Sequence, residues 1–556
     1  MRALRASELP PAIDAMLARA LTVVSVTSMD TEAAREAAVH LATLSGAGTA
    51  TGATGATGAK GPAEAPGAAR ATSPDAVPHA PTTGPAQPTD PPTTVTGPDV
   101  DRATELLERG RGLLLSRRME ARADLGELRS AHPELADEFE RLTELLAAEH
   151  EPVAPGDAER DRLAKLRTSR ALDGLVDHVR DRPGFGDFLR PLTADQLRAL
   201  AADGPVVVLN HARQLCHAVV VSERSITALT LAPEAEEVAG AARRLREAVD
   251  VINAQGASRS SPAELVAAGA EVRRTLSWAW HRIVRPVLEH VGAAEPVHGG
   301  GSWPRIRWVP TGAFHALPLH AAQCTRPDCD QGGCGAALDT VVSSYVPGFQ
   351  TLAHARARAE RCGLATDGGA LLVAAPEEEL PGVEAATRYA AGLLGAGEPL
   401  IGAAATREAV LAGLGGAAWA HFGCHAASDP AAPSGALLHL PSGESLPVLD
   451  ICRARPGTAR LAFLAACGTA RTSERLSDEA IHITGAFLLA GFPTAVGTLW
   501  EIDSTHADHV TRDFYGRAVG GAGQGPALAL HHSVRALRER IPQRPHIWAA
   551  YVHAGA

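Results

Sequence analysis

Short apolar runs separated by amphipathic stretches dominate the chain from about residue 204 onward. Runs of strand length predict β-strands at 206–210, 217–222, 225–231, 305–310, 370–376, 419–425, 460–467 and 494–500. Stretches with helical periodicity lie between many of them, for example around 233–252 and 262–291. Strands that alternate with helices are typical of a largely parallel sheet with helices on its faces. The pattern therefore predicts an α/β fold with a mostly parallel sheet flanked by helices.

The first 200 residues follow a different pattern. Residues 1–45 predict a short helical segment, and residues 46–100 are nearly all Ala, Gly, Thr and Pro. The second stretch predicts a disordered linker, because it lacks the large apolar residues that offset the entropy cost of ordering. Leucines at helical spacing then predict a helical region over 101–200, with one helix beginning at Pro133. Within it, 101–149 is similar to a single tetratricopeptide-type hairpin, with an ordinary helical hairpin as the alternative.

Composition narrows the class of protein. The net charge is −11, whereas proteins that bind nucleic acids usually carry an excess of positive charge, so we expect no nucleic-acid partner. No run reaches the roughly 18 apolar residues of a membrane span, and the N-terminus lacks the pattern of a secretory leader. Eight cysteines in 556 residues suit a reduced compartment, so we expect a cytoplasmic protein. Two lysines against many arginines, with abundant Ala and Gly, indicate a GC-rich bacterial genome.

Two of the predicted strands end on reactive side chains. The apolar run in WAHFGCHA is followed by His425, and the apolar run in RLAFLAACGTA is followed by Cys467. Sites in parallel sheets form beyond the carboxyl ends of the strands, so neighbouring strands would bring both side chains to one edge. An imidazole within hydrogen-bond reach converts a thiol into a nucleophilic thiolate, and the imidazolium then protonates the leaving amine. The alternative is an inert cysteine, since cysteine is often simply buried.

The order and spacing of this pair favour a peptidase. His425 precedes Cys467 by 42 residues (467 − 425), similar to the spacing in caspase-type enzymes. Backbone N–H groups of Ala426 and Cys467 are candidates for an oxyanion hole. His421 is the competing histidine, and its place inside the strand predicts a hydrogen-bonded core residue. No Walker A, G-x-S-x-G or H-E-x-x-H motif is present, and we expect no cofactor.

Several motifs in order resemble the CHAT domain family, whose members are relatives of caspases and separases. They are RWVPTGAFHALPLHAA (307–322), HFGCHA (421–426), LAFLAACGTA (461–470), SDEAIHITGAFLLAGFPTAVGTLWEID (477–503) and HIWAAYVHAG (546–555). The resemblance implies a caspase-like CHAT peptidase domain over 201–556, with His425 and Cys467 as its catalytic dyad. The family usually has Gly after the catalytic His, where this chain has Ala426; the added Cβ matters only if the backbone there needs a positive φ.

The resemblance also implies a substrate class. Separases and their relatives cut after a basic residue, whose side chain binds an acidic group of the enzyme. Counted from Cys467, Asp508 matches the position of that acidic group best, and Asp503 is the second candidate. Charge pairing would supply the specificity. The alternative is that these acids cap and solvate a helix beginning near Ser504.

Partners follow by analogy with the family. They would be a protein or peptide substrate and a regulatory protein acting through the N-terminal helices. The alternative function is a CHAT-fold binding or scaffold protein with little or no activity, in a signalling or defence pathway.

A second cluster of reactive residues lies in CTRPDCDQGGC. Cys324, Cys329 and Cys334 are five residues apart, and His315 and His320 are near in sequence. Three cysteines and one histidine are a known zinc ligand set. The spacing is loose for such a site, so our expectation is a thiol-bearing loop without metal. Structural zinc and a redox pair are the alternatives.

Overall fold

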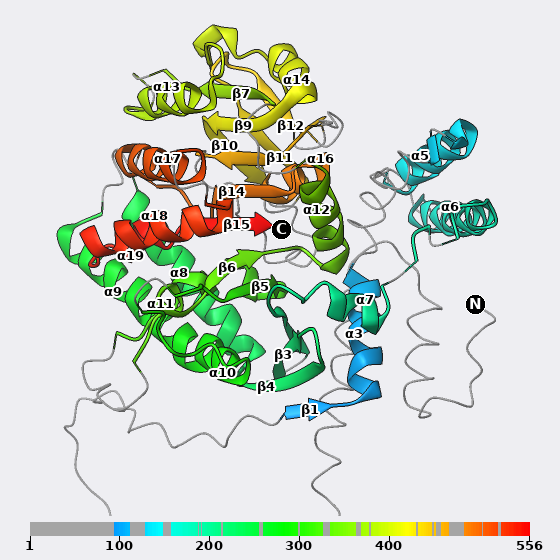
Figure 1. The fold of residues 1–556 in the computed structure, drawn as a ribbon, viewed down its shortest axis with the longest axis horizontal. Coiled ribbons are helices and arrows are strands. Elements are labelled where there is room, and N and C mark those ends of the chain that lie inside the picture. Colours follow the sequence, from blue (N-terminus) through cyan, green and yellow to red (C-terminus); the bar gives the residue numbers. More distant parts are fainter. Residues whose placement is uncertain are drawn as a thin grey trace, which may run out of the picture.

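A computed structural model describes most of the chain beyond residue 93 (Figure 1). The described residues are 94–111, 128–129, 131–147, 157–186, 188–190, 192–212, 215–254, 260–298, 301–325, 334–362, 368–376, 378, 380–429, 432–447, 450–451, 458–465, 483–502, 504–520 and 524–556. The predicted helical segment 1–45 and most of the predicted linker therefore lie outside the described residues.

A twelve-stranded sheet forms the centre of the molecule, in the order β1-β4-β3-β2-β5-β6-β15-β14-β13-β9-β7-β8. Its strands are β1 (Thr94–Thr96), β2 (Val206–Ala212), β3 (Leu215–Val221), β4 (Ile226–Glu234), β5 (Arg305–Pro310), β6 (Val342–Tyr345), β7 (Gly369–Ala374), β8 (Leu400–Ile401), β9 (Ala417–Gly423), β13 (Leu461–Leu464), β14 (Thr494–Thr498) and β15 (Tyr551–Gly555). The predicted α/β class, with a mostly parallel sheet flanked by helices, is confirmed.

Nine of the twelve strands form two parallel blocks of opposite direction, and β3, β4 and β1 extend the sheet beyond β2 by antiparallel pairing. Strands β8, β7, β9, β13 and β14 run parallel to one another, and β2, β5, β6 and β15 form the second block. The blocks meet where β14 pairs antiparallel with β15 over five residue pairs. The carboxyl ends of β9, β13 and β14 therefore share one edge, which is where ligands bind in sheets of this kind.

Helices cover both faces of the sheet (Figure 1). One face carries α8 (Ala235–Asn253), α9 (Pro262–Ala279), the π-helix η2 (Trp280–Val284), α10 (Arg285–His290), α13 (Val383–Leu394), α17 (Ser504–Ala518), α18 (Pro526–Arg540) and α19 (Pro545–Trp548). The other face carries α3 (Pro98–Arg111), α7 (Ala194–Ala199), α12 (Phe349–Cys362), α14 (Arg407–Gly416) and α16 (Ile483–Ala490). Short helical turns are η3 (Gly312–Ala316), η4 (Leu319–Ala321), α11 (Ala337–Thr340) and η5 (Gly402–Ala404).

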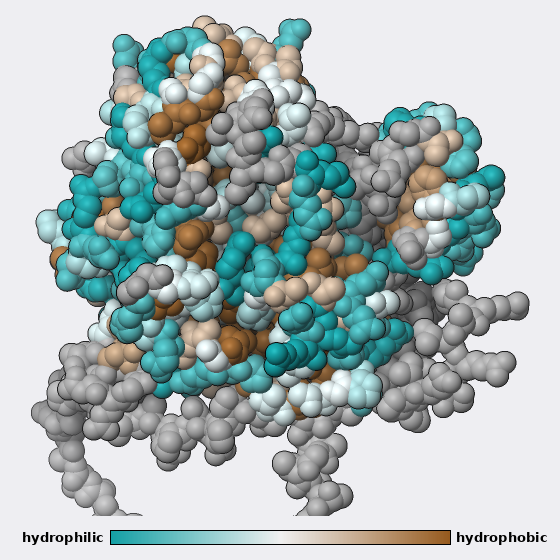
Figure 2. Space-filling view, in the orientation of Figure 1, coloured by the Kyte–Doolittle hydropathy of each residue, from teal (hydrophilic) through white to brown (hydrophobic). Residues whose placement is uncertain are grey.

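The apolar side chains of these helices face the sheet. On the face drawn in Figure 2, hydrophobic residues form separate patches among hydrophilic ones. Within the described residues, no helix is both long and apolar enough to cross a lipid bilayer.

The N-terminal region differs from the sequence prediction in two places. The predicted linker over 46–100 ends earlier, because Thr94–Thr96 pairs with β4 as the edge strand of the sheet and α3 begins at Pro98, after Gly97 with a φ of +127°. Two threonines and a valine suit an edge strand, and proline suits the first turn of a helix.

The helical hairpin is also placed differently. The predicted hairpin over 101–149 is wrong for the described part: α3 packs with α7 against β4, whereas α5 (Pro133–Ala147) pairs with α6 (Asp157–Arg180). Phe139 and Leu142 of α5 share a small core with Leu172 and Val179 of α6. The leucines of α3 and α7 instead face Val206 and Val219 of the sheet. The predicted boundary at 200/201 therefore passes through a shared core.

A second, three-stranded antiparallel sheet follows β9 directly and was not predicted. It contains β10 (His425–Asp429), β11 (Ala432–His439) and β12 (Ser445–Pro447). The turn between β11 and β12 holds Gly443 at a φ of +87°. Strand β10 lacks the apolar run of a buried strand, so periodicity alone gives no signal for it.

Candidate active site

Strands β9 and β13, which precede His425 and Cys467 in the sequence, are parallel neighbours. Their register pairs Trp419 with Leu461, and Phe422 with Leu464. Every residue of both strands is buried, as expected for the centre of a sheet covered on two faces. The sequence prediction that both strands end at one edge is therefore correct. Cys467 itself lies outside the described residues.

His425 stands at the start of β10, two residues after β9 ends at Gly423. Its side chain is exposed, and it lies opposite His439 of β11 in the register of the second sheet. The next residue, Ala426, is half-buried and lies opposite Leu438. Leu189 is the only described non-glycine residue with a positive φ. The backbone of Ala426 therefore does not require glycine, and its Cβ causes no strain.

His421 lies within β9 and has a different environment. Its side chain is 1% exposed and stacks on the ring of Phe463, with centroids 5.4 Å apart and planes inclined by 10°. Nε2 lies 3.1 Å from Oγ1 of Thr387, and Nδ1 lies 3.2 Å from the hydroxyl of Tyr515. His421 thus links β9 to α13 and α17 beneath the edge of the sheet, as the prediction of a core histidine requires.

These bonds determine which nitrogen of His421 carries the proton. Thr387 donates its hydroxyl hydrogen to the carbonyl oxygen of Val383, at 2.8 Å. Its oxygen therefore accepts from Nε2–H of His421, which leaves Nδ1 to accept from Tyr515. Burial lowers the pKa of His421 to about 3 and raises that of Tyr515. A neutral, doubly bonded imidazole is unsuited to proton exchange with a substrate.

Asp508 lies on α17, beside the first residues of α13. A Cβ built on Gly382, which precedes α13 and has a φ of +86°, would lie 3.3 Å from Cβ of Asp508. The next residue, Val383, packs closely on Gly423 at the end of β9. A Cβ added to Gly423 would lie 2.4 Å from Cγ1 of Val383 and would clash with it. A short series of contacts therefore joins Asp508 to the end of β9.

The carboxylate of Asp508 already has a partner. It accepts a hydrogen bond from Nε of Arg512 at 2.8 Å, and the two side chains are 26% and 38% exposed. The guanidinium of Arg512 lies over the ring of Tyr389, 5.3 Å from its centroid. This pairing was not predicted from the sequence. Asp503, the second acidic candidate, lies outside the described residues, and α17 begins at Ser504 as expected.

The segment that follows β14 is fixed by two long-range hydrogen bonds. The indole nitrogen of Trp500 donates to the carbonyl oxygen of His546 at 2.6 Å, and Asn253 donates to the carbonyl oxygen of Glu501 at 2.8 Å. Trp500 and Ile502 are buried. This segment therefore forms a fixed wall at the edge of the sheet where β9 and β13 end, and sequence periodicity gave no signal for the bonds that hold it.

The cysteine cluster lies elsewhere, next to α9 and η2. Cys324 and Cys334 are described and Cys329 is not. His315 and His320, their neighbours in sequence, bond instead to the carbonyl oxygen of Gly312 and the hydroxyl of Tyr345. Among the described residues, no group of three or more His, Cys, Asp and Glu side chains is arranged so that it could hold a metal ion.

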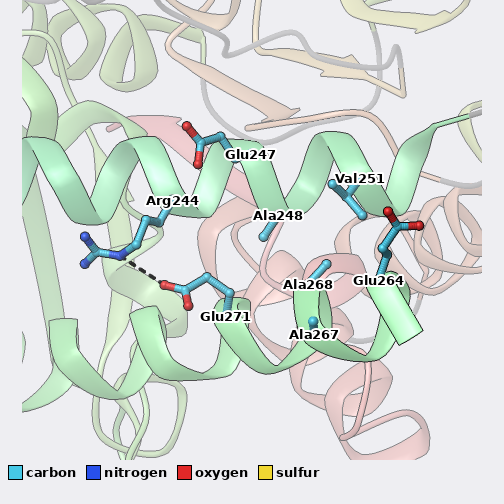
Figure 3. A pocket seen from close by; sticks show the side chains of 8 residues that line it. All are labelled: Arg244, Glu247, Ala248, Val251, Glu264, Ala267, Ala268 and Glu271. Atoms are coloured by element: carbon cyan, nitrogen blue, oxygen red, sulfur yellow. Dashed lines mark hydrogen bonds and ion pairs between the residues drawn. The ribbon is translucent and has the colours of Figure 1, made fainter. Parts of the chain in front are cut away.

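A groove between α8 and α9 contains none of the predicted site residues (Figure 3). Nε of Arg244 bonds to Oε1 of Glu271 across it at 3.1 Å. It is lined by Arg244, Glu247, Ala248, Val251, Glu264, Ala267, Ala268 and Glu271. It has neither a nucleophile nor a histidine, so the edge of the sheet beyond β9 and β13 is the better candidate for chemistry.

Solved structures give distant matches. Separase from Saccharomyces cerevisiae, in its complex with securin, is 12% identical with a TM-score of 0.44, covering 84% of this chain and 38% of that chain. RgpB from Porphyromonas gingivalis, in a complex of its pro- and mature domains, is 11% identical with a TM-score of 0.35, covering 56% of this chain and 75% of that chain. Such values support no inference about activity. This chain spans well under half of the separase, and no curated protein matches it.

The family assignment rests on the sequence match. The CHAT domain family matches residues 273–556, which are 284 of the 556 residues and therefore just over half of the chain. The match includes β9, β13 and β14, as well as the positions of His425 and Cys467. The chain belongs to the CHAT domain family.

Proposed function

We propose that this protein is a cysteine endopeptidase in which His425 and Cys467 form the catalytic dyad. The register of β9 and β13 carries the proposal. Phe422 pairs with Leu464, and His425 and Cys467 each follow their member of that pair by three residues. Neighbouring strands are about 4.8 Å apart, and three residues reach at most about 10 Å. His425 and Cys467 are therefore equally far along the chain from two paired residues on neighbouring strands, which supports their lying within reach of each other.

The reaction follows from the chemistry of the two side chains. His425 takes the proton of the Cys467 thiol, and the thiolate attacks the carbonyl carbon of the scissile peptide bond. The carbonyl oxygen becomes an oxyanion that the backbone N–H groups of Ala426 and Cys467 stabilise. His425 returns its proton to the leaving amine as the C–N bond breaks. A water molecule, deprotonated by His425, then cleaves the thioester and regenerates the thiol.

The exposure of His425 supports this role over His421. A general base must take up and release a proton during each turnover, which an exposed imidazole does at low cost. His421 is buried, neutral and engaged at both nitrogens. The non-positive φ of Ala426 removes the main reason to expect an inactive relative.

Asp508, with Asp503, is the proposed acidic group for a basic side chain of the substrate. Asp508 already binds a guanidinium, that of Arg512, in a partly exposed pair. Exposed pairs of this kind contribute at most about 1 kcal/mol, so a substrate arginine can replace Arg512 at small cost. Regulation by a partner protein, acting through the N-terminal helices, completes the proposal.

The test is cleavage of a peptide library that varies the residue before the scissile bond, followed by mass spectrometry. Wild type and Cys424→Ala, which removes the neighbouring buried thiol, should cleave after Arg or Lys; Cys467→Ala should not. Asp508→Asn should lower kcat/KM for basic peptides by about tenfold or more, the value of one charge-assisted contact. Equal cleavage by wild type and Cys467→Ala would refute the peptidase. No cleavage by wild type, with binding partners present, would favour a scaffold protein.

A further inference from the structure

The two chain segments that carry Cys324 and Cys334 are held together by their backbone. Gln323 and Ala336 form an antiparallel bridge, and the N–H of Cys324 donates to the carbonyl oxygen of Gly335 at 2.8 Å. Cys334 directly precedes this partner of Cys324, so the two cysteines are diagonal neighbours across the paired segments. Their side chains are therefore brought together by the fold and not by the sequence spacing alone.

The same segments pack on η2, which supplies a histidine. A Cβ on Gly335 would lie 2.6 Å from the ring of Trp280, the first residue of η2, so the absence of a side chain at this glycine permits the close approach. His281 is the next residue of η2, and its Nε2 lies 3.2 Å from Sγ of Cys324. An imidazole from a separate element therefore forms a hydrogen bond with one of the two thiols.

The two sulfurs lie close enough to be joined. Sγ of Cys334 is 3.9 Å from Sγ of Cys324, and both are present as thiols in this structure. A disulfide bond is about 2.05 Å long, so the sulfurs need to approach each other by about 1.9 Å. Cys334 is exposed, so its side chain has room to rotate toward Cys324.

The hydrogen bonds give the two thiols different roles. The thiol of Cys334 donates to the sulfur of Cys324, so the hydrogen of the Cys324 thiol is directed to the imidazole of His281. The thiolate is the form of cysteine that reacts with oxidants, and a neighbouring imidazole generates it by accepting the proton. Cys324 is therefore the thiol that reacts first, and Cys334 is the second thiol that completes a disulfide.

We infer that Cys324 and Cys334 form a peroxide-sensitive thiol–disulfide pair in which His281 is the base. His281 takes the proton of the Cys324 thiol, and the thiolate attacks the terminal oxygen of a hydroperoxide. An S–O bond forms as the O–O bond breaks, and the leaving oxygen takes the proton back from His281, as water or an alcohol. The sulfur of Cys334 then attacks the sulfenic acid on Cys324; the S–S bond forms, the S–O bond breaks, and the departing hydroxyl leaves as water with the Cys334 proton.

This reaction is balanced, because the two sulfurs together lose the two electrons that the hydroperoxide gains. It involves neither His425 nor Cys467, so the inference is independent of the proposed peptidase.

The experiment treats the reduced full chain with hydrogen peroxide at pH 7, alkylates the remaining thiols and maps the cysteines by mass spectrometry. Asp328 and Asp330 flank Cys329, so a protease that cuts before aspartate places each cysteine of the cluster in its own peptide. Wild type should form a Cys324–Cys334 disulfide that dithiothreitol reduces, and Cys329→Ser should form it at the wild-type rate. Absence of a disulfide, or a bond from Cys329 as the main product, would overturn the inference.

The role of His281 is tested by the rate of oxidation. At pH 7, His281→Ala should react about tenfold more slowly, because an unassisted thiol with a pKa of about 8.5 is only about 3% ionised there. At pH 9.5, where a thiol ionises without a base, both proteins should react within about threefold of each other, which excludes misfolding as the cause. His298→Ala, which removes an exposed imidazole elsewhere, should match wild type at both pH values. Equal rates for wild type and His281→Ala at pH 7 would show that His281 is not the base.

The order of the two thiols is tested with dimedone, a reagent for sulfenic acids. In Cys334→Ser the sulfenic acid on Cys324 cannot be resolved by its partner, so peroxide and dimedone together should label Cys324. In Cys324→Ser the label on Cys334 should be at least about tenfold weaker, because Cys334 has lost the thiol that its own sulfur attacks and was not the first to react. Stronger labelling of Cys334 than of Cys324 would reverse their roles and overturn the inference.

Discussion

The interior of β9 and the residues just beyond its end each carry a histidine, at positions 421 and 425. Inside the strand, His421 is covered by Phe463, Thr387 and Tyr515, and burial lowers its pKa to about 3. Beyond the end, His425 is exposed and lies two residues after the carboxyl end of β9, the end of a parallel strand near which ligands bind. Residue type alone therefore does not identify a catalytic base. Four residues along the chain separate a buried histidine that holds three elements together from an exposed one that is the proposed catalytic base.

The largest effect should come from removing the exposed histidine. His425→Ala should lower kcat/KM for a cleaved peptide by about 10²–10⁴-fold, the contribution of a general base. Its free energy of unfolding should change by no more than about 0.5 kcal/mol, as for other surface substitutions. The matched control is His439→Ala, which removes the exposed histidine opposite it in β11. Loss of activity in the control but not in His425→Ala would reverse the assignment.

The buried histidine should show the opposite profile. His421→Ala removes a stacked ring and leaves Thr387 and Tyr515 without their partner, which should cost about 2–4 kcal/mol of unfolding free energy. Urea denaturation measures it, and kcat/KM per folded molecule should change by less than threefold, a difference of about 0.6 kcal/mol. A stable variant with no activity would place His421 in the chemistry.

The hydrogen bonds of His421 allow a finer test. Thr387→Val leaves Nε2–H of His421 without an acceptor, which should cost about 1–3 kcal/mol. Tyr515→Phe removes only the donor to Nδ1 and should cost about 1 kcal/mol. Each of these substitutions combined with His421→Phe should change the free energy of unfolding by less than the sum of the two single changes, because the three side chains form one network. Additive effects in urea denaturation would contradict the network.

The smallest effect is a pH dependence. The unfolded pKa of His421 is about 6.5 and its folded pKa is about 3, so the unfolded chain binds the extra proton and stability falls as pH falls. Between pH 7 and pH 6 the loss from this residue should be about 0.7 kcal/mol. The free energy of unfolding of wild type should therefore fall by about 0.7 kcal/mol more than that of His421→Phe between pH 7 and pH 6. Parallel curves for the two proteins would show that His421 is protonated in the fold.

The strands that build the site could be predicted because they are buried on both faces. Apolar runs such as WAHFG and LAFL have little alternative to a central strand, and the structure places them as neighbours. Strand β15 was not predicted, although HIWAAYVHAG was noted, because a five-residue run at the end of a helical segment has no distinctive period. Its pairing with β14 joins the two blocks of the sheet.

Contacts between distant elements could not be predicted. The pairing of α5 with α6, instead of a hairpin over 101–149, depends on which apolar faces meet in space. The same holds for His281, which lies 43 residues from Cys324 in sequence and whose π-helical turn has no simple sequence signal. His315 and His320 were nearer in sequence but bond elsewhere. Periodicity predicts elements, whereas contacts between side chains of distant elements depend on how those elements pack.

The dyad is tested most directly by the reactivity of the Cys467 thiol. Wild type and His425→Ala would be treated with an alkylating peptide carrying Arg at the recognition position, and the modified cysteine mapped by mass spectrometry over time. We expect rapid labelling of Cys467 in wild type and labelling slower by about 10²-fold or more in His425→Ala, because the thiolate loses its base. His421→Phe should label at the wild-type rate. Equal rates in wild type and His425→Ala, or labelling of another cysteine in preference to Cys467, would contradict the dyad.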